Sequence, residues 1–307
     1  MIHEESRTVI GIDIGGTKIA GGVVDFPAGV VRTQHIIPTH ATRGGRAVLD
    51  DVERLVQQLA EEASVLGSAV HAVGVGLCEL VSPTGNILSA NCVDWINLPV
   101  CDRLTTVAPV TIEADVRAAA RAEALFGLGK QFHQFLFVTV GTGIASCLVL
   151  DGIPFTGARG ATGTMASSPL SVPCEKCGQT NHTTLEQLAA GPALVARYNQ
   201  FHQATARTGH DVLAAAIAGD QDALFVTLSA SEALGSSVGL LVNILDPEAV
   251  IVGGGLGLSE GLFWDGFTAA TRQHIWSKVN RDLPILRAAT GSNAGLLGAA
   301  VSAWKNC

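Results

Sequence analysis

The chain has few charged residues, and the basic ones are the scarcer kind. Charged side chains make up 15% of its 307 residues, and 19 Lys and Arg stand against 27 Asp and Glu, which gives a formal net charge of −8. Nucleic acids and anionic membranes bind to basic protein surfaces. This balance therefore speaks against either as the main partner, and an anionic ligand would have to be held by local geometry.

Long apolar runs are also lacking. No stretch of about 18 uninterrupted apolar residues occurs, and the segment Met1 to Arg7 does not contain the apolar core of a signal peptide. The seven cysteines are an odd, scattered set, which is a poor disulfide framework and suits a reducing compartment. We therefore expect a cytoplasmic protein.

Glycine and apolar residues are abundant, and one arrangement of them along the sequence occurs twice. The hydrophobic fraction of 48% over 307 residues predicts a well-buried protein of two domains. An apolar run at 9–14, a glycine turn at 15–18 and a second apolar run to Asp25 return as 135–140, 141–143 and 144–151. Each copy predicts a β-hairpin with glycine at its tip.

Glycine turns of this kind can bind anions, because a residue without a side chain lets backbone N–H groups approach a phosphate closely. Two matched turns could therefore hold a chain of phosphates. The plainer alternative is that each turn only closes its hairpin. A P-loop or a Rossmann fingerprint is disfavoured, because both require a helix after the loop, whereas β-branched residues resume here and place Lys18 on the outgoing strand.

Further elements follow from apolar spacing and turn residues. We expect an N-terminal domain over 1–109, completed by a C-terminal helix at 295–307, and a second domain over 110–294. A stretch rich in Gly, Ser, Thr and Pro, within 157–186, is predicted to be a long functional loop without regular elements. The predicted elements are helices at 47–66, 115–125, 229–245 and 294–304, and strands at 72–77, 110–112 and 249–252.

These residues resemble the ROK family of repressors, open reading frames and sugar kinases, within the actin-like ATPase superfamily. The segment 11–18 is similar to its first phosphate motif, 138–143 to its second and 251–255 to its adenosine motif. The segments 91–95 and 157–160 also resemble segments of the family, and they follow in the same order along the chain. The resemblance implies an actin-like (ribonuclease H-like) duplicated α/β fold, with two α/β domains around a nucleotide and sugar cleft.

The resemblance also implies ATP as phosphate donor, Mg²⁺ as cofactor and a sugar hydroxyl as acceptor. Asp13 would act on Mg²⁺, and Gly254 and Gly255 would admit the adenosine. The phosphates would be bound by Gly15, Gly16, Thr17, Lys18, Gly141, Thr142 and Gly143. ROK repressors carry an N-terminal DNA-binding domain, for which the early first motif leaves no room, so we expect no nucleic-acid partner. By resemblance we expect a homodimer.

Asp115 matches the catalytic aspartate of the family. Phosphoryl transfer requires positioning, charge neutralisation and a carboxylate that accepts the proton of the attacking hydroxyl. The alternative is that Asp115 only caps the helix it precedes, which is a favoured role for Asp. Glu113 is a weaker rival for the base, since strand alternation places it beside Asp115 only if the strand continues that far.

The sugar contacts depart from the family pattern. Thr164 and Ser167 stand where a Glu and a His of the family bind the sugar, Ala114 replaces an Asn, and Cys78-Glu79 replaces Pro-Gly. Asn91 and the acid Glu186 remain as candidate substrate contacts. Three lost polar contacts at roughly 1 kcal/mol each would weaken glucose binding over about 100-fold.

We therefore expect phosphorylation of a hydroxyl on an amino sugar or a cyclitol rather than on plain glucose. The primary hydroxyl is the preferred acceptor. Glu79 would pair with the amine, unless it is a solvent-facing loop residue. Alternatives are a glucokinase or N-acetylmannosamine kinase, and a sugar sensor without catalysis, which Ala145 in place of a family glycine favours slightly. Polyphosphate is a further candidate donor, although the triple glycine at 253–255 favours a nucleoside.

A zinc site is also suggested by the resemblance. The family's cysteine motif is kept in part as Cys174 and Cys177, and His182 lies near the place of the last cysteine. A closed structural zinc site needs four ligands. We expect Zn²⁺ here if a fourth ligand exists, and a bare loop otherwise.

Overall fold

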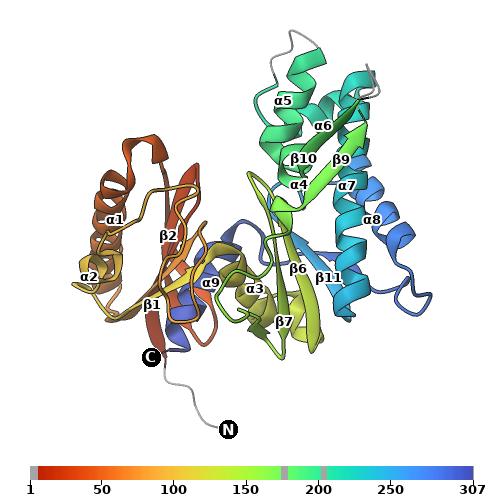
Figure 1. The fold of residues 1–307 in the computed structure, drawn as a ribbon. Coiled ribbons are helices and arrows are strands. Elements are labelled where there is room, and N and C mark those ends of the chain that lie inside the picture. The colour runs from red at the N-terminus through yellow and green to blue at the C-terminus, as the bar shows by residue number, and fades with distance from the viewer. Residues whose placement is uncertain (1–5, 174–178, 202–205, 307) are drawn as a thin grey trace. The chain divides into compact units, whose positions relative to one another are not determined.

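The chain divides into two compact units. The computed structural model describes residues 6–173, 179–201 and 206–306. The first unit comprises Met1–Gln131, Gly152–Thr162 and Ser292–Cys307, and the second comprises Phe132–Asp151 and Gly163–Gly291. The colour bar of Figure 1 traces the chain through both units.

The first unit is built on a mixed sheet. Its strand order is β3-β2-β1-β4-β5, with β2 antiparallel to both β1 and β3, and with β4 parallel to both β1 and β5. The first predicted hairpin is therefore confirmed, and β3 is an edge strand that the sequence did not indicate. The bounds are β1 Arg7–Ile14, β2 Lys18–Phe26, β3 Val30–Pro38, β4 Val70–Leu77 and β5 Val110–Ala114.

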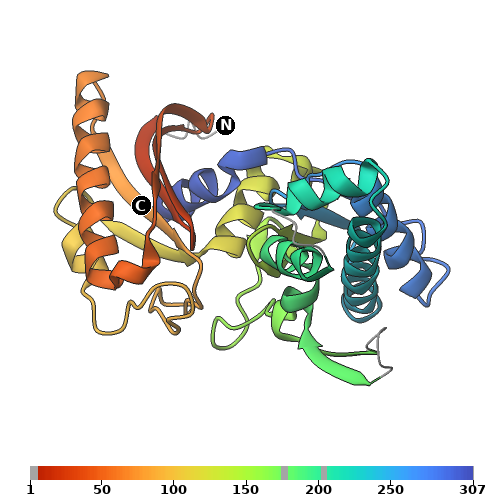
Figure 2. The ribbon, with the colours of Figure 1, turned by 90° about the horizontal axis from the view of Figure 1, so that it is seen from above.

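Helices cover both faces of this sheet. Alternation along β1 turns Ile10 and Ile12 toward the core with α1 (Gly45–Val65) and α2 (Val100–Leu104), and turns Val9 toward the core with α9 (Ala294–Trp304). Figure 2 shows the orange α1 and the blue α9 on opposite sides of the red strands. The helices predicted at 47–66 and 294–304 are confirmed within two residues.

Glycines on the sheet let α9 pack closely. A Cβ atom on Gly11 or on Gly74 would overlap backbone carbonyl oxygens of α9, and one on Gly298 would overlap the carbonyl of Ala118 on α3 (Asp115–Phe126). The three positions have no room for a side chain. Close backbone packing therefore fixes α9 between the sheet and α3, and the helix predicted at 115–125 is confirmed.

The division into units differs from the boundary expected after residue 109. Because β5 pairs in parallel with β4 and α3 packs on α9, residues 110–131 belong with the first unit. The chain returns to this unit over Gly152–Thr162, which contains the short β8 (Ile153–Pro154). The C-terminal helix lies in the first unit, where the sequence placed it.

The second unit repeats the core of the first. Its strands β6 (Gln134–Val140) and β7 (Ile144–Leu150) form an antiparallel hairpin, and β11 (Ala249–Gly253) pairs in parallel with β6 and with β12 (Ile285–Arg287). An antiparallel hairpin beside a parallel strand is likewise the arrangement of β2, β1 and β4. The second predicted hairpin and the duplication are confirmed.

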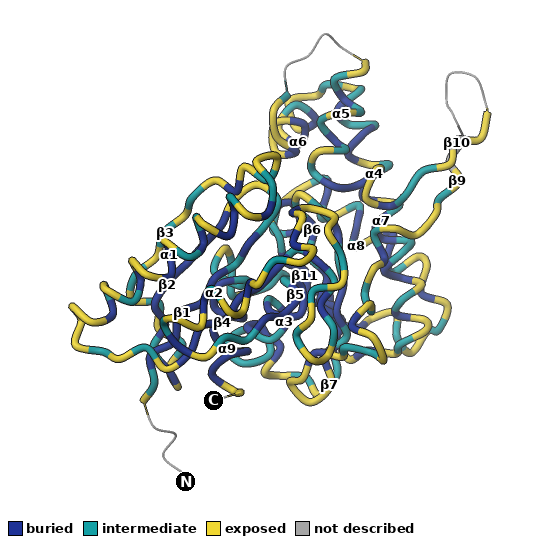
Figure 3. Tube along the Cα trace, turned by 60° about the vertical axis from the view of Figure 1, so that its left-hand side comes forward, coloured by how far each residue is buried: buried dark blue, intermediate teal, exposed yellow. Residues whose placement is uncertain are grey.

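In the described part of the second unit, helices pack against this sheet and against one another. They are α4 (Leu185–Ala189), α5 (Gly191–Phe201), α6 (Gly209–Ile217), α7 (Gln221–Leu245) and α8 (Leu262–His274). The side chains that they bury, together with those of β6 and β11, form one core, and Figure 3 shows the buried stretches in dark blue. By length and composition α7 is the one described helix that could cross a membrane, which is weak evidence for a span, and half of its most apolar window is buried.

The prediction that 157–186 lacks regular elements was wrong. Strands β9 (Pro169–Pro173) and β10 (Thr180–Thr184) pair in antiparallel register, and a 3₁₀ turn covers Met165–Ser167. Threonine is common in exposed strands because its branched Cβ favours extended backbone. Its hydroxyl is equally common in loops, so composition alone did not distinguish the two.

Candidate active site

Three parallel strands of the first unit end at the same edge of its sheet. The register pairs Asp13 of β1 with Gly76 of β4, and Gly76 with Glu113 of β5. The residues at or just beyond the carboxyl ends are therefore neighbours: Asp13, then Cys78 and Glu79, then Asp115. Open α/β sheets bind ligands at this edge.

Asp13 lies close to two glycines. A Cβ atom on Gly295 would overlap the Asp13 carboxyl group, and one on Gly76 would lie 3.6 Å from its Oδ1. Burial raises the pKa of Asp13 to about 6, and the positive charge of Lys18 offsets part of this rise. Its carboxyl group therefore titrates close to neutral pH and would gain from a nearby cation.

Asp115 is the first residue of α3, and the N-cap is Ala114, without a side-chain capping bond. The capping alternative for Asp115 is thus not realised; its Oδ1 instead accepts the N–H of Val116 at 2.6 Å. Burial, and after it the charge of Asp13, raises the pKa of Asp115 to about 7. A base is most effective when its pKa lies near the working pH.

Glu113 has a different role from Asp115. Its buried carboxylate accepts hydrogen bonds from Arg117 at 2.6 Å and from Arg121 at 3.2 Å. Arg117 also donates to the carbonyl oxygens of Val81 at 2.6 Å and Gly160 at 3.0 Å. Glu113 is therefore a structural partner of Arg117, which anchors segment 157–160, and the rival assignment as base has no support.

The first glycine turn is fixed by backbone and hydroxyl contacts. The N–H of Gly15 donates to the carbonyl of Lys18 at 3.0 Å. The buried Thr39 donates its hydroxyl to the Gly15 carbonyl at 2.6 Å and its N–H to the Thr17 carbonyl at 3.0 Å. Lys18 is exposed on β2, as predicted. The sequence carried no signal for Thr39.

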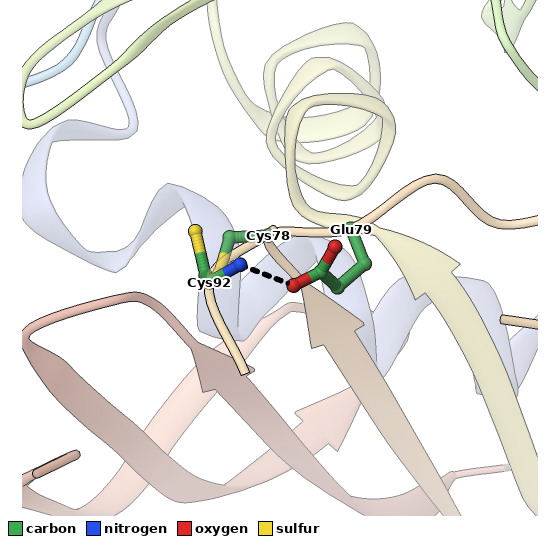
Figure 4. A group of neighbouring side chains, drawn as sticks. All are labelled: Cys78, Glu79 and Cys92. Carbon is green, nitrogen blue, oxygen red and sulfur yellow. Dashed lines mark hydrogen bonds between the residues drawn. The ribbon is translucent and has the colours of Figure 1, made fainter. Parts of the chain in front are cut away.

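Glu79 is buried, and its carboxylate is fully engaged. Oε1 accepts the N–H groups of Cys92 (2.7 Å) and Val93 (3.1 Å), and Oε2 accepts the N–H of Asn91 (2.8 Å) and the hydroxyl of Ser89 (2.5 Å). Figure 4 shows the bond to Cys92. The alternative of a solvent-facing loop residue is wrong. Glu79 holds the backbone of 89–93, which includes the candidate sugar contact Asn91.

The second glycine turn lies in the second unit. The N–H of Gly141 donates to the carbonyl of Gly143 at 2.9 Å, and that of Gly191, at the start of α5, donates to the carbonyl of Gly141 at 2.8 Å. A Cβ atom on Gly141 would lie 3.7 Å from the backbone nitrogen of Gly255. The second phosphate motif and the adenosine motif are therefore side by side.

The adenosine motif has a backbone that only glycine fits. Gly254 has φ +81°, and a Cβ atom there would overlap the carbonyl of Val140. Next to it, a ring nitrogen of His210 on α6 lies 3.1 Å from the carbonyl oxygen of Gly255. No sequence motif singled out His210, because the glycine motif that it contacts is 45 residues further along the chain.

The remaining candidate sugar contacts fall in three places. Glu186, on α4, accepts the N–H of Ile144 at 3.0 Å and so lies at the second glycine turn. Thr164 and Ser167 are exposed, and the Ser167 hydroxyl donates to the Thr164 carbonyl at 2.8 Å. Ala114 is buried on β5, next to Asp115.

Only part of the predicted zinc site can be placed. Cys174 and Cys177 lie outside the described residues. His182 is exposed on β10, and its Nδ1 lies 3.2 Å from the hydroxyl oxygen of Ser171 on β9. The described residues therefore leave the zinc prediction open.

Comparison with known proteins places the chain in a family. The family model described as ROK family matches residues 9–306. The chain belongs to the ROK family. Among curated proteins, this ROK protein is 29% identical to a glucokinase of Streptomyces coelicolor, over 95% of the chain and 96% of that protein. It is 28% identical to an N-acetyl-D-glucosamine kinase of Erwinia tasmaniensis, over 94% and 97%.

Solved structures confirm the fold of this ROK protein. A ROK family glucokinase from Streptomyces griseus, in complex with glucose and AMPPNP, superposes with a TM-score of 0.83 at 28% identity, over 97% of the chain and 99% of that structure. A ROK hexokinase from Thermus thermophilus gives 0.77 at 31% identity, over 97% and 98%. The expected actin-like α/β fold is thus confirmed.

Proposed function

We propose that this ROK protein transfers the γ-phosphoryl group of ATP to a hydroxyl, the primary one, of a hexose-like sugar. The observation that carries the proposal is the pair Asp13 and Asp115 at one edge of a sheet, beside a glycine turn that matches a second one in sequence and hairpin geometry. Relatives named as glucokinase and N-acetylglucosamine kinase support it.

Each glycine turn would bind phosphate groups. Gly15 to Lys18 and Gly141 to Gly143 present backbone N–H groups beside glycines, which have no side chain to keep an anion away. The adenosine would lie at Gly254 and Gly255, which adjoin the second turn. A relative that binds AMPPNP supports a nucleotide over polyphosphate.

Asp13 fits the expected Mg²⁺. A carboxylate oxygen is a ligand that Mg²⁺ prefers, and burial keeps the pKa of Asp13 near 6, so a cation would favour its ionised form. Mg²⁺ would neutralise charge on the phosphates. Asp13 would hold it through water, since Mg²⁺ keeps several of its waters when bound.

Asp115 would act as the general base. Its raised pKa lets the carboxylate take the hydroxyl proton near neutral pH. Asp115 is the first residue of α3, and the packing of this helix against α9 gives the side chain a rigid support. Positioning of the hydroxyl toward the phosphate would supply most of the rate enhancement.

For the acceptor we propose a ring other than plain glucose. Ala114, Thr164 and Ser167 do not offer the polar groups of the family pattern, while Glu186 retains a carboxylate at the second turn. The four donors on Glu79 remove the reason to expect an amine beside it. The structure therefore does not favour an amino sugar over other rings, and amino sugars, a cyclitol and N-acetylmannosamine are compared directly in the test.

A coupled assay of ADP release tests the proposal. The panel contains glucose, glucosamine, 3-amino-3-deoxyglucose, N-acetylmannosamine, N-acetylglucosamine and a cyclitol. We expect sugar-dependent ADP release, with the highest kcat/KM on a ring other than glucose. Highest efficiency on glucose would overturn the substrate proposal alone. Sugar binding without any ADP release would instead identify a sensor.

We also propose a cytoplasmic homodimer without a nucleic-acid partner. Four large apolar side chains are exposed near the C-terminal ends of α7 and α8: Leu240, Ile244, Trp276 and Val279. Hydrogen bonds of Asn243 to His274 and Trp276 tie the two segments together. Sedimentation should give twice the chain mass, and a lower mass on replacing Trp276 with Ser.

A further inference from the structure

Two thiols lie beside the catalytic edge of the first unit. The sulfur atoms of Cys78 and Cys92 and a carboxylate oxygen of Glu79 all lie within 4.8 Å of one another (Figure 4). Cys78 follows β4, where its N–H donates to the carbonyl of Ile14 at 3.2 Å. Cys92 is exposed in the segment that Glu79 holds.

A metal is the first ligand to consider for such a group, but the chemistry of Glu79 disfavours it. Both of its oxygens already accept two hydrogen bonds each, so they offer little electron density to a cation. The two thiols alone supply half of the four ligands that a closed zinc site needs. The two thiols are better suited to form a disulfide with each other.

The two cysteines differ in the way that a reactive pair requires. Cys92 is exposed, whereas Cys78 is half-buried. A hydrogen bond with Cys92, followed by burial, raises the pKa of Cys78, which keeps its proton between the two sulfurs. The accessible Cys92 would therefore meet an oxidant first, and Cys78 would act second.

We propose that Cys78 and Cys92 form a reversible disulfide when a peroxide oxidises the protein, and that this bond switches off the kinase. The Cys92 thiol gives up its proton, and the thiolate attacks one peroxide oxygen to form a sulfenic acid, while the other oxygen takes up that proton and leaves as water. The sulfur of Cys78 then attacks the Cys92 sulfur, and the sulfenic oxygen leaves as a second water. Two thiols are oxidised, and one peroxide is reduced to two waters.

The location explains why the bond would affect activity. A Cβ atom on Gly16 would lie 3.7 Å from the Cys92 sulfur, so this sulfur adjoins the first glycine turn. A disulfide holds its sulfurs about 2.05 Å apart, and closing it draws Cys92 toward Cys78. Asn91 and the turn next to Gly16 would then lose their present alignment. Cytosolic disulfides, where they occur, are typically transient and redox-sensing.

Because this inference rests on the kinase function proposed above, the test measures bond formation and activity separately. Wild type, Cys92→Ser and the matched control Cys101→Ser, an exposed cysteine on α2, are treated with hydrogen peroxide and then with dithiothreitol. Peptide mapping of non-reduced protein detects the 78–92 cross-link. ADP release is expressed as a fraction of each variant's own reduced activity.

We expect the 78–92 cross-link in wild type and Cys101→Ser, with at least about a tenfold fall in activity that dithiothreitol reverses. Cys92→Ser should form no such link and keep most of its own activity. Absence of the link in wild type overturns the disulfide. An equal fall in Cys92→Ser overturns the switch. No ADP release from reduced wild type would instead contradict the kinase function, independently of the cross-link.

Discussion

Burial, and after it the negative charge of Asp13, raises the pKa of Asp115. The two carboxyl groups come from the ends of β1 and β5, with β4 between these strands. Burial acts on both in the same direction, which leaves Asp13 near 6 and Asp115 near 7. This arrangement costs stability in the absence of ligands, and in the proposed function Asp13 would bind a cation while Asp115 would take a proton.

Replacing Asp115 with Asn should remove catalysis while preserving the fold. The amide keeps the size of the side chain but cannot accept the hydroxyl proton, so turnover should fall by on the order of 10²-fold or more. ATP binding, measured by calorimetry, should stay near that of wild type. Asp102→Asn on α2 is the matched control, because Asp102 is exposed and lies outside the proposed site. Near-normal turnover in Asp115→Asn would exclude it as the base.

The pH profile should reflect the ionisation of Asp115. A base must be deprotonated to act, and its pKa of about 7 means that kcat/KM should fall toward acid from about pH 7, by up to about tenfold for each pH unit. The profile is recorded with saturating Mg²⁺ and buffers of constant ionic strength. A flat profile from pH 8 down to pH 5 would contradict this assignment.

The same raised pKa makes a prediction about stability. The folded pKa of Asp115, about 7, exceeds its reference value of 3.8, so its contribution to folding is fully present below pH 3.8 and is lost as pH rises through 7. Asp115→Asn should therefore raise Tm at pH 8, by at least about 2 °C, and give no gain near pH 4. Scanning calorimetry without ligands checks this. A lower Tm at pH 8 would argue that the carboxylate is not destabilised there.

Arg117 should be a large contributor to stability. Its guanidinium is almost fully buried and pairs with Glu113 while donating to two carbonyl groups. Arg117→Met leaves these partners buried, which should cost about 3–5 kcal/mol of unfolding free energy in denaturant titrations. Adding Glu113→Gln should recover part of the loss.

The matched control for Arg117 is Arg54→Met, which removes an exposed pair with Asp51 and should cost less than about 1 kcal/mol. Equal losses for the two arginines would show that burial of the Arg117 pair has no special importance.

Gly254 should be intolerant of a side chain. Alanine there would need a positive φ and would overlap the Val140 carbonyl, so the adenosine motif must shift away from the second glycine turn. We expect Gly254→Ala to raise KM for ATP more than about tenfold, with little change in KM for sugar. Gly152→Ala is the control, because Gly152 has φ +77° but open space around it. A similar KM for ATP in both variants would remove Gly254 from the nucleotide site.

The sequence predicted the repeated part of the fold and less of its surroundings. Both glycine hairpins were foreseen, because strand period and turn residues are local signals. Thr39, Arg117 and His210 were not, since their partners lie 24, 36 and 45 residues away in the chain. The domain boundary also differed, because pairing of β5 with β4 is a long-range choice that apolar spacing does not encode.

Glu79 shows the limit of reasoning from substitution alone. A new carboxylate beside a sugar motif suggested a ligand contact, yet the structure directs it to four donors of the 89–93 segment. Only the three-dimensional structure shows that both oxygens of Glu79 already accept hydrogen bonds from its own chain.

In the proposed function one carboxylate, Asp115, would enable transfer of phosphate from ATP to a sugar. Mass spectrometry of reactions with ATP, Mg²⁺ and the best sugar of the panel measures this directly. Wild type should form one sugar phosphate for each ADP, and Asp115→Asn should form almost none. ADP without sugar phosphate would contradict transfer to a sugar, and equal product from both proteins would contradict the role of Asp115 as the base.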